Sequence, residues 1–105
     1  MINKYKIHIT KSAKEDIKGI IIYIKSQFSA NLTADKMLDA FDNAILGLVD
    51  FPYKYPSIRD ERLASLGFRM LTVKNYIVFY SIDESSSIVN IERVLYGRRD
   101  WKHIL

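Results

Sequence analysis

The sequence predicts a single α+β domain with the element order β-α-α-β-β-β. Three patterns support this fold class: a short alternating segment near the start, two stretches with apolar side chains at helical spacing, and three β-rich runs towards the end. A chain of 105 residues has room for one domain with its own core and too little for two. We therefore expect residues 1–105 to form one domain.

The first strand and the first helix follow each other closely. Residues 5–10 alternate between polar and apolar side chains, as in a strand with one buried face. Ser12 and Glu15 have the spacing of a capping box, which satisfies free amide groups at the start of a helix. The helix that follows carries one apolar stripe, made of Ile17, Ile20, Ile21, Ile24 and Phe28.

A second helix completes a helical hairpin. Residues 29–32 break the first helix, and Thr33 is placed to cap the second, which ends before Pro52. Two amphipathic helices joined by so few residues form an antiparallel hairpin and leave one flank to cover a sheet. The apolar face of the second helix consists of Met37, Leu38, Phe41, Ala44, Ile45, Leu48 and Val49.

An irregular connection leads into the β-rich region. Residues 51–65 contain two prolines and a cluster of charges, which indicates a surface loop. The middle β-rich run is almost continuously apolar, so we expect a central strand covered on both faces. The tail from Arg98 to Leu105 is expected to form a short helix or an extended arm. The three runs are residues 68–73, 76–82 and 88–95, and the intervals 74–75 and 83–87 have lengths that suit hairpin turns.

Composition excludes several kinds of chemistry. The chain has no cysteine, so disulfides, thiolate catalysis and cysteine-ligated zinc are ruled out. The two histidines, His8 and His103, have no partner at ligand spacing, and we expect no metal and no cofactor. His8 is expected to face outward from the first strand. His103 is interpreted either as a solvated tail residue or as an acid–base group.

The amino terminus and the aliphatic runs indicate where the protein resides. The first residues lack the apolar core of a signal peptide. The longest aliphatic run, residues 20–24, is far shorter than the ~18 residues that cross a bilayer. We therefore expect a cytoplasmic protein with no membrane partner.

Positive charge is concentrated in the second half of the chain. The formal net charge is +4, and every arginine lies after residue 51. Arginine has a planar, forked set of donors that suits phosphates and carboxylates. The carboxy-terminal half therefore either faces an anionic partner or carries a basic solvated surface.

Arg93 is the least expected charge in the β-rich region. Strict alternation along residues 88–95 places it on the same face as Val89, Ile91 and Leu95, which is the more apolar face of that strand. A cation there needs a carboxylate or an opening to solvent. Two interpretations stay open: an ion pair with an acid from the helices or the irregular loop, or a positive group at the floor of a concave surface.

Arg98, Arg99, Asp100 and Trp101 form the densest polar–aromatic cluster. Arginine beside tryptophan is typical of protein contact hot spots. The same pair suits nucleic acid, where arginine meets phosphate and tryptophan stacks on a base. The alternative for Trp101 alone is that its ring packs the tail against the domain.

Three segments together resemble the RelE/ParE toxin superfamily, and most closely its ParE or plasmid stabilisation branch. They are Phe68-Arg69-x-Leu71, the run 75–80, and the closing run 91–100 with its Arg93, Tyr96 and Gly97-Arg98-Arg99. The resemblance covers essentially the whole chain. It implies a helical hairpin on a twisted, mainly antiparallel sheet, and a growth-inhibiting toxin neutralised by a cognate antitoxin in a heterotetramer or higher assembly. ParE-like members of this family act on DNA gyrase, and RelE-like members cut messenger RNA in the ribosome.

Ile77 is the residue that distinguishes between gyrase and messenger RNA as the target. The resemblance implies that RNA-cutting members carry an arginine at this point of the central strand, and isoleucine removes that cation. We therefore expect an inhibitor that binds gyrase through Arg93, Arg98, Arg99 and Trp101, and not an enzyme. The alternative is a metal-independent endoribonuclease, an mRNA interferase, acting with Lys54, Arg69, Arg93, Tyr96 and Arg98. A third possibility is a relative that has lost toxicity.

The antitoxin is expected in the groove between the helical hairpin and the sheet. Exposed parts of the helical stripes are the expected receivers, and this follows from the resemblance more than from the residues. The candidate contacts are Ile20, Ile24, Phe41 and Leu48.

Overall fold

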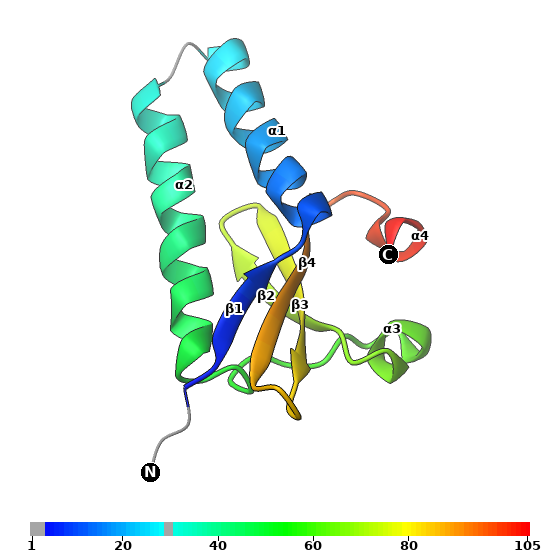
Figure 1. Cartoon of the computed structure of the whole chain (residues 1–105). Helices are drawn as coiled ribbons and strands as arrows, with labels where there is room; N and C mark the ends of the chain where they lie inside the picture. Colours follow the sequence, from blue (N-terminus) through cyan, green and yellow to red (C-terminus); the bar gives the residue numbers. More distant parts are fainter. Residues whose placement is uncertain (1–3, 29–30) are drawn as a thin grey trace.

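A four-stranded sheet with a helical hairpin on one face forms the body of the protein (Figure 1). The computed structural model describes residues 4–28 and 31–105. The strand order is β1-β4-β3-β2, with β1 parallel to β4 and the other pairs antiparallel. The main elements are β1 (Lys6–Ile9), α1 (Lys11–Phe28), α2 (Asn31–Leu46), β2 (Arg69–Val73), β3 (Tyr76–Asp83) and β4 (Ile88–Tyr96). The predicted α+β fold class and element order are confirmed.

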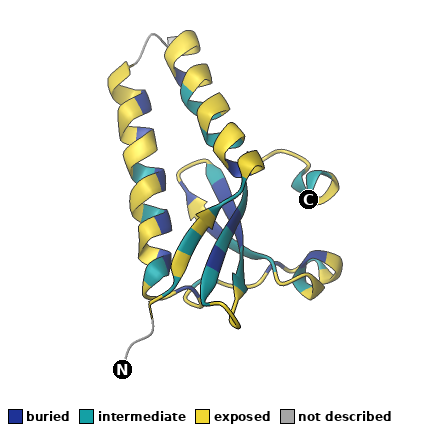
Figure 2. Ribbon diagram, in the orientation of Figure 1, coloured by how far each residue is buried: buried dark blue, intermediate teal, exposed yellow. Residues whose placement is uncertain are grey.

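The two faces of the sheet carry two separate cores. Buried residues occur on the helical hairpin, on the strands and on α3 (Figure 2). The larger of the two cores, here called the hairpin core, lies under α1 and α2 and includes Phe41, Val78 and Tyr80. The smaller one, the tail core, lies on the opposite face, under the carboxy-terminal tail. Its buried members are Ile58, Leu63, Ile77, Phe79 and Leu95. Strand β3 contributes to both cores, which confirms the prediction of a central strand covered on both faces.

Both helices begin earlier than predicted. Helix α1 starts at Lys11, and its cap is Thr10, whose hydroxyl accepts a hydrogen bond from the Ala13 amide at 3.1 Å. The same hydroxyl donates to the Glu92 carbonyl, so the cap also joins the helix to β4. The prediction of a capping box at Ser12 was therefore wrong, because Thr10 caps the helix and also contacts Glu92. Helix α2 starts at Asn31, which places Thr33 inside it.

The apolar stripes of both helices are largely as predicted. Ile24, Met37 and Phe41 are buried, but Leu38 lies on the rim of the stripe and is 38% exposed. The side chain of Phe28 and the predicted break at residues 29–30 lie outside the described residues.

Short helices occur where the sequence predicts irregular structure. The turn η1 (Gly47–Val49) follows α2, and the helix α3 (Glu61–Ser65) lies inside the predicted loop. Asp60 caps α3 by accepting a hydrogen bond from the Leu63 amide, and Leu63 anchors the helix in the tail core. The carboxy-terminal tail forms α4 (Trp101–Ile104), one of the two predicted alternatives.

A β-bulge in β4 changes which face Arg93 occupies. Phe79 pairs with Arg93 and Tyr80 pairs with Ile91, so Glu92 is an extra residue in the ladder. Paired residues share a face, and Phe79 belongs to the tail core while Tyr80 belongs to the hairpin core. Arg93 therefore shares the face of Leu95 and not that of Val89 and Ile91. The strict alternation assumed from the sequence was wrong at this point.

Candidate functional site

The carboxyl end of β4 opens into a pocket of about 410 Å³ beside α1. One flank of α1 supplies Glu15, Gly19 and Tyr23, and the end of β4 and the tail supply Tyr96 and Arg99. Strand β1 ends opposite Ile91, so among the described residues the outer edge of β4 beyond Ile91 has no strand partner, and this leaves space for the pocket.

Three tyrosines form an aromatic wall shared by this pocket and an adjoining one of about 530 Å³. Tyr76 and Tyr96 make an edge-to-face contact with ring centroids 5.9 Å apart. Phe41 makes a second edge-to-face contact with Tyr76, with ring centroids 5.7 Å apart. Tyr23 lines both pockets from α1. Burial, with smaller contributions from Tyr23 and Tyr96, raises the pKa of Tyr76 above its usual value. Tyr76 is therefore neutral at physiological pH, and the wall offers aromatic rings to a partner.

Arg93 forms an ion pair with Asp16 at the edge of this site. Its Nε and Nη2 atoms donate to the two carboxylate oxygens at 2.7 and 2.9 Å, and the Val94 amide donates to Asp16 at 2.9 Å. The Asp16 carboxylate thus supplies a hydrogen-bond acceptor to the backbone of β4 beyond the end of β1. Asp16 raises the pKa of Arg93, chiefly through the hydrogen bond. Of the two interpretations of Arg93, the ion pair with a helical acid is the one observed.

Arg98 and Arg99 project from the turn after β4 and are exposed. Gly97 holds this turn close to the β2–β3 hairpin, because its amide donates to the Asn75 carbonyl at 2.8 Å. A Cβ atom at Gly97 would lie only 3.2 Å from that oxygen. The backbone therefore positions the two arginines without using their side chains, and both residues are exposed.

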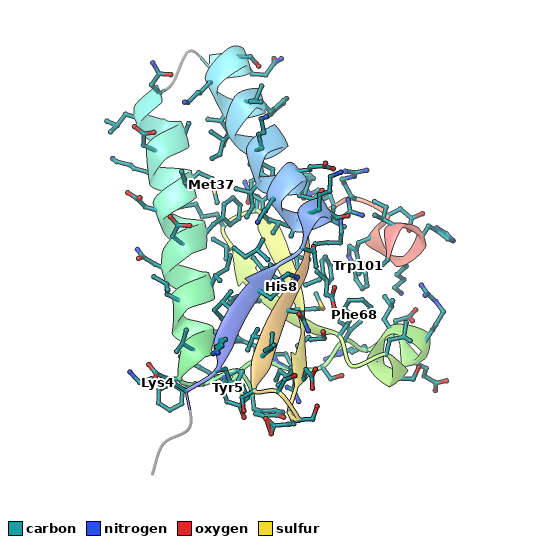
Figure 3. The ribbon with its side chains drawn as sticks, in the orientation of Figure 1. Lys4, Tyr5, His8, Met37, Phe68 and Trp101 are labelled. Carbon is teal, nitrogen blue, oxygen red and sulfur yellow. The ribbon has the colours of Figure 1, made fainter. Side chains whose placement is uncertain are left out.

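Trp101 packs the tail onto the sheet. Its ring lies 5.3 Å from that of Phe79, centroid to centroid, and Figure 3 places it with Phe68 on the side that carries α3 and α4. Arg62 of α3 donates to the Lys102 carbonyl at 2.7 Å and so ties the two short helices together. Trp101 is partly buried, so the predicted packing role is observed, while a contact with the target remains a prediction.

The residues of the endoribonuclease alternative do not form one cluster. Arg69 pairs with Tyr80 and so lies on the hairpin face, where its guanidinium donates to the Tyr55 carbonyl and lies 5.0 Å from the Tyr53 ring. Lys54 lies over the Tyr55 ring in the same region. Tyr96 and Arg98 are at the other end of the sheet, and Arg93 is held by Asp16.

Most of the residues predicted to contact the antitoxin are buried. Phe41 and Leu48 are completely buried and Ile24 is 7% exposed, because they fill the hairpin core. Ile20 is partly exposed and lines the 410 Å³ pocket. The exposed apolar side chains of the hairpin are instead Ile22, Tyr23, Leu32, Leu38 and Leu46.

The predicted site residues did not include Asp16, Tyr23 or Tyr76. Asp16 and Tyr23 lie seven residues apart, about two helical turns, on the flank of α1 outside its apolar stripe. This shared flank is the signal that was available. His8 is exposed on β1, as predicted. Within residues 4–28 and 31–105, no group of three histidine or acidic side chains is arranged to hold a metal ion. No helix in the same ranges is long and apolar enough to cross a membrane.

Comparison with known proteins decides the family. Residues 7–101, nearly the whole chain, match the family described as the ParE toxin of the type II toxin–antitoxin system, parDE. The chain belongs to the ParE toxin family. No curated protein matches this ParE-family chain in sequence.

Solved structures of toxin–antitoxin complexes share the fold of this ParE-family toxin. The chromosomal ParDE system of Pseudomonas aeruginosa is similar with a TM-score of 0.73 and 14% identity, over 90% of this chain and 97% of that one. The RelBE2 complex of Mycobacterium tuberculosis is similar with a TM-score of 0.66 and 20% identity, over 89% and 98%. The archaeal RelE–RelB complex of Pyrococcus horikoshii gives 0.52 and 12%, over 91% and 98%.

Proposed function

We propose that this ParE-family toxin inhibits DNA gyrase by binding it through the surface at the end of β4. The contact residues are the exposed Arg98 and Arg99, together with Tyr96 and the tyrosine wall behind it. A cognate antitoxin neutralises the toxin, in keeping with the complexes in which the structural neighbours were solved.

The observation that carries the proposal is that two exposed arginines follow a hydrogen-bonded turn beside exposed aromatic rings. Tyr96 is 39% exposed and Tyr23 is 55% exposed. Tyrosine and arginine contribute disproportionately to the binding energy of protein interfaces, because rings and forked cations gain contacts with little loss of conformational freedom. The turn at Gly97 reduces the ordering cost further.

The environment of Ile77 supports a binder over a nuclease. Ile77 is 8% exposed and packs in the tail core with Phe79 and Leu95. The central strand therefore presents an apolar, covered side chain where an RNA-cutting relative is expected to carry a cation. Since Arg69 and Arg93 are engaged by a carbonyl group and a carboxylate, the charges needed to stabilise a phosphorane are not assembled on one surface.

One observation favours the alternative, a ribosome-dependent endoribonuclease. Tyr96, Arg98 and Arg99 lie within a few residues of each other, and a phenol beside two cations can bind RNA and help to orient a 2′-hydroxyl group. In this alternative, the same surface binds messenger RNA in place of gyrase.

The deciding experiment is a pair of assays on the purified chain. We expect inhibition of gyrase supercoiling, lost when both arginines are reversed (Arg98→Glu with Arg99→Glu). Arg59→Glu, at another exposed arginine in the connection before α3, is the control for each single reversal, Arg98→Glu or Arg99→Glu, and should inhibit like the unchanged protein. Cleavage of messenger RNA on ribosomes, with supercoiling unaffected, would contradict the proposal and establish the nuclease.

A further inference from the structure

An apolar groove runs along the helical hairpin on the side of β1. Two adjoining hollows of about 340 and 350 Å³ share Ile9 and continue from α1 to the end of α2. They are lined by three large apolar side chains that are unusually exposed: Ile22 at 55%, Leu38 at 38% and Leu46 at 61%. A contiguous apolar surface of this kind on a small domain marks a contact with another protein.

The two rims of this groove carry opposite charges. Lys14 and Lys18 line it from α1, and Lys25 lies two turns further along the same flank. Asp42 lines it from α2, and Asp35 lies two turns earlier on the same flank. All five side chains are exposed, and within the described part of the chain none of them forms an ion pair.

The lysines of one rim and the aspartates of the other also lie at similar positions along the axis of the hairpin. Lys18 lies ten residues before Phe28, the last residue of α1, and Asp42 lies eleven residues after Asn31, the first of α2. Lys25 and Asp35 lie three and four residues from the same two ends. Because both helices rise ~1.5 Å per residue, each lysine lies at nearly the height of an aspartate on the other rim.

We propose that this groove binds a second copy of the chain in a symmetric dimer. A two-fold axis parallel to the hairpin places α1 of one copy over α2 of the other, with the heights unchanged. Lys18 then faces Asp42 of the second copy, and Lys25 faces Asp35 of the second copy. Each contact occurs twice, and Ile22, Leu38 and Leu46 become covered between the two rows.

Charge complementarity selects a second copy over an unrelated partner. To bind an unrelated protein, the groove needs rim charges that complement that protein's sequence. Such a partner does not require the two rims to carry opposite charges at equal heights. A self-complementary surface does require this, because every residue of one rim must meet the other rim. The same arrangement gives four ion pairs at the border of an apolar centre, which fixes the register of the two copies.

Sedimentation velocity of the purified chain over a range of concentrations tests the dimer. We expect dimers whose dissociation constant rises by about tenfold or more in Lys18→Glu and in Asp42→Lys, since each variant places like charges opposite each other twice. An equimolar mixture of the two variants should dimerise again, because each then meets its opposite charge. Lys36→Glu makes the same change of charge on α2, away from the groove, and should leave the dimer intact.

Two outcomes would overturn the dimer. One is an unchanged chain that stays monomeric at all concentrations, and the other is a mixture of variants that stays as weak as each variant alone. If the reversals impair capture of the cognate antitoxin while the unchanged chain remains a monomer, the groove belongs to the antitoxin. The test does not involve gyrase or the ribosome, so its result is independent of the proposed target.

Discussion

The two faces of the sheet are covered in very different ways. The hairpin face lies under α1 and α2, helices of 18 and 16 residues, and the tail face lies under α3 and α4, helices of five and four residues. Long helices bury a continuous stripe, whereas single turns contribute one or two anchors each, here Leu63 and Trp101. The hairpin face should therefore dominate stability, and the tail face should mainly position the residues that follow β4.

The largest effect is expected from Phe41→Ala in the hairpin core. Phe41 is completely buried and supports Tyr76 through an edge-to-face contact. Removing the ring should lower the free energy of unfolding by about 3–5 kcal/mol, because it leaves a cavity that the helices cannot close. Urea denaturation followed by circular dichroism measures the change. A loss below 1 kcal/mol would mean that the hairpin face is not the dominant core.

A smaller loss is expected from Trp101→Ala on the tail face. The ring is only partly buried, so we expect a decrease of about 2 kcal/mol in the same denaturation experiment. The Trp101→Phe variant is the control, since it keeps an aromatic ring against Phe79 and should recover most of the loss. If Trp101→Ala destabilised the protein as much as Phe41→Ala, the contrast between the two faces would fail.

Breaking the link between α1 and β4 with Asp16→Ala should cost a comparable amount. The change leaves Arg93, which is partly buried, and the amide of Val94, which is a buried residue, without their acceptor. We expect a decrease of about 1–3 kcal/mol in the free energy of unfolding. The double variant Asp16→Ala with Arg93→Ala should be no less stable than Asp16→Ala alone. A double variant that is much less stable would show that Arg93 contributes through another contact.

Alkaline pH should weaken the hairpin face through Tyr80. Burial raises the pKa of Tyr80 to about 12, and its hydroxyl donates to the Pro52 carbonyl at 2.6 Å. Since the folded pKa lies above the ordinary value of ~10, this contribution to stability is complete below pH 10 and is lost as pH rises towards 12. Tyr80→Phe should lower the free energy of unfolding by about 1 kcal/mol at pH 7 and flatten the alkaline decline. Parallel pH titrations of thermal unfolding compare the two proteins.

The smallest effect on stability is expected at the proposed contact surface. Both arginines after Gly97 are exposed, so Arg98→Ala and Arg99→Ala should each change the free energy of unfolding by less than about 0.5 kcal/mol. Their effect on gyrase inhibition should be large by comparison. Substantial destabilisation by either change would show that these side chains serve the fold and not the target.

Local periodicity was sufficient to predict most of the fold. The three β-rich runs match β2, β3 and β4 to within one residue, because apolar and β-branched side chains mark strands wherever they pair. The stripes of Ile24, Met37 and Phe41 were equally readable, since helical spacing determines which side chains share a face. The family resemblance rested on the same local runs.

Contacts between segments far apart in the chain could not be predicted from local periodicity. The bulge at Glu92 reverses the face of Arg93, and its partner Asp16 lies 77 residues away. Thr10 replaces Ser12 as the cap because it also reaches the Glu92 carbonyl, 82 residues away. The sequence by itself determined which segments become the two long helices and the four strands. Only the tertiary structure decided which charged and aromatic side chains are neutralised, buried or left exposed, because those outcomes depend on neighbours brought together by folding.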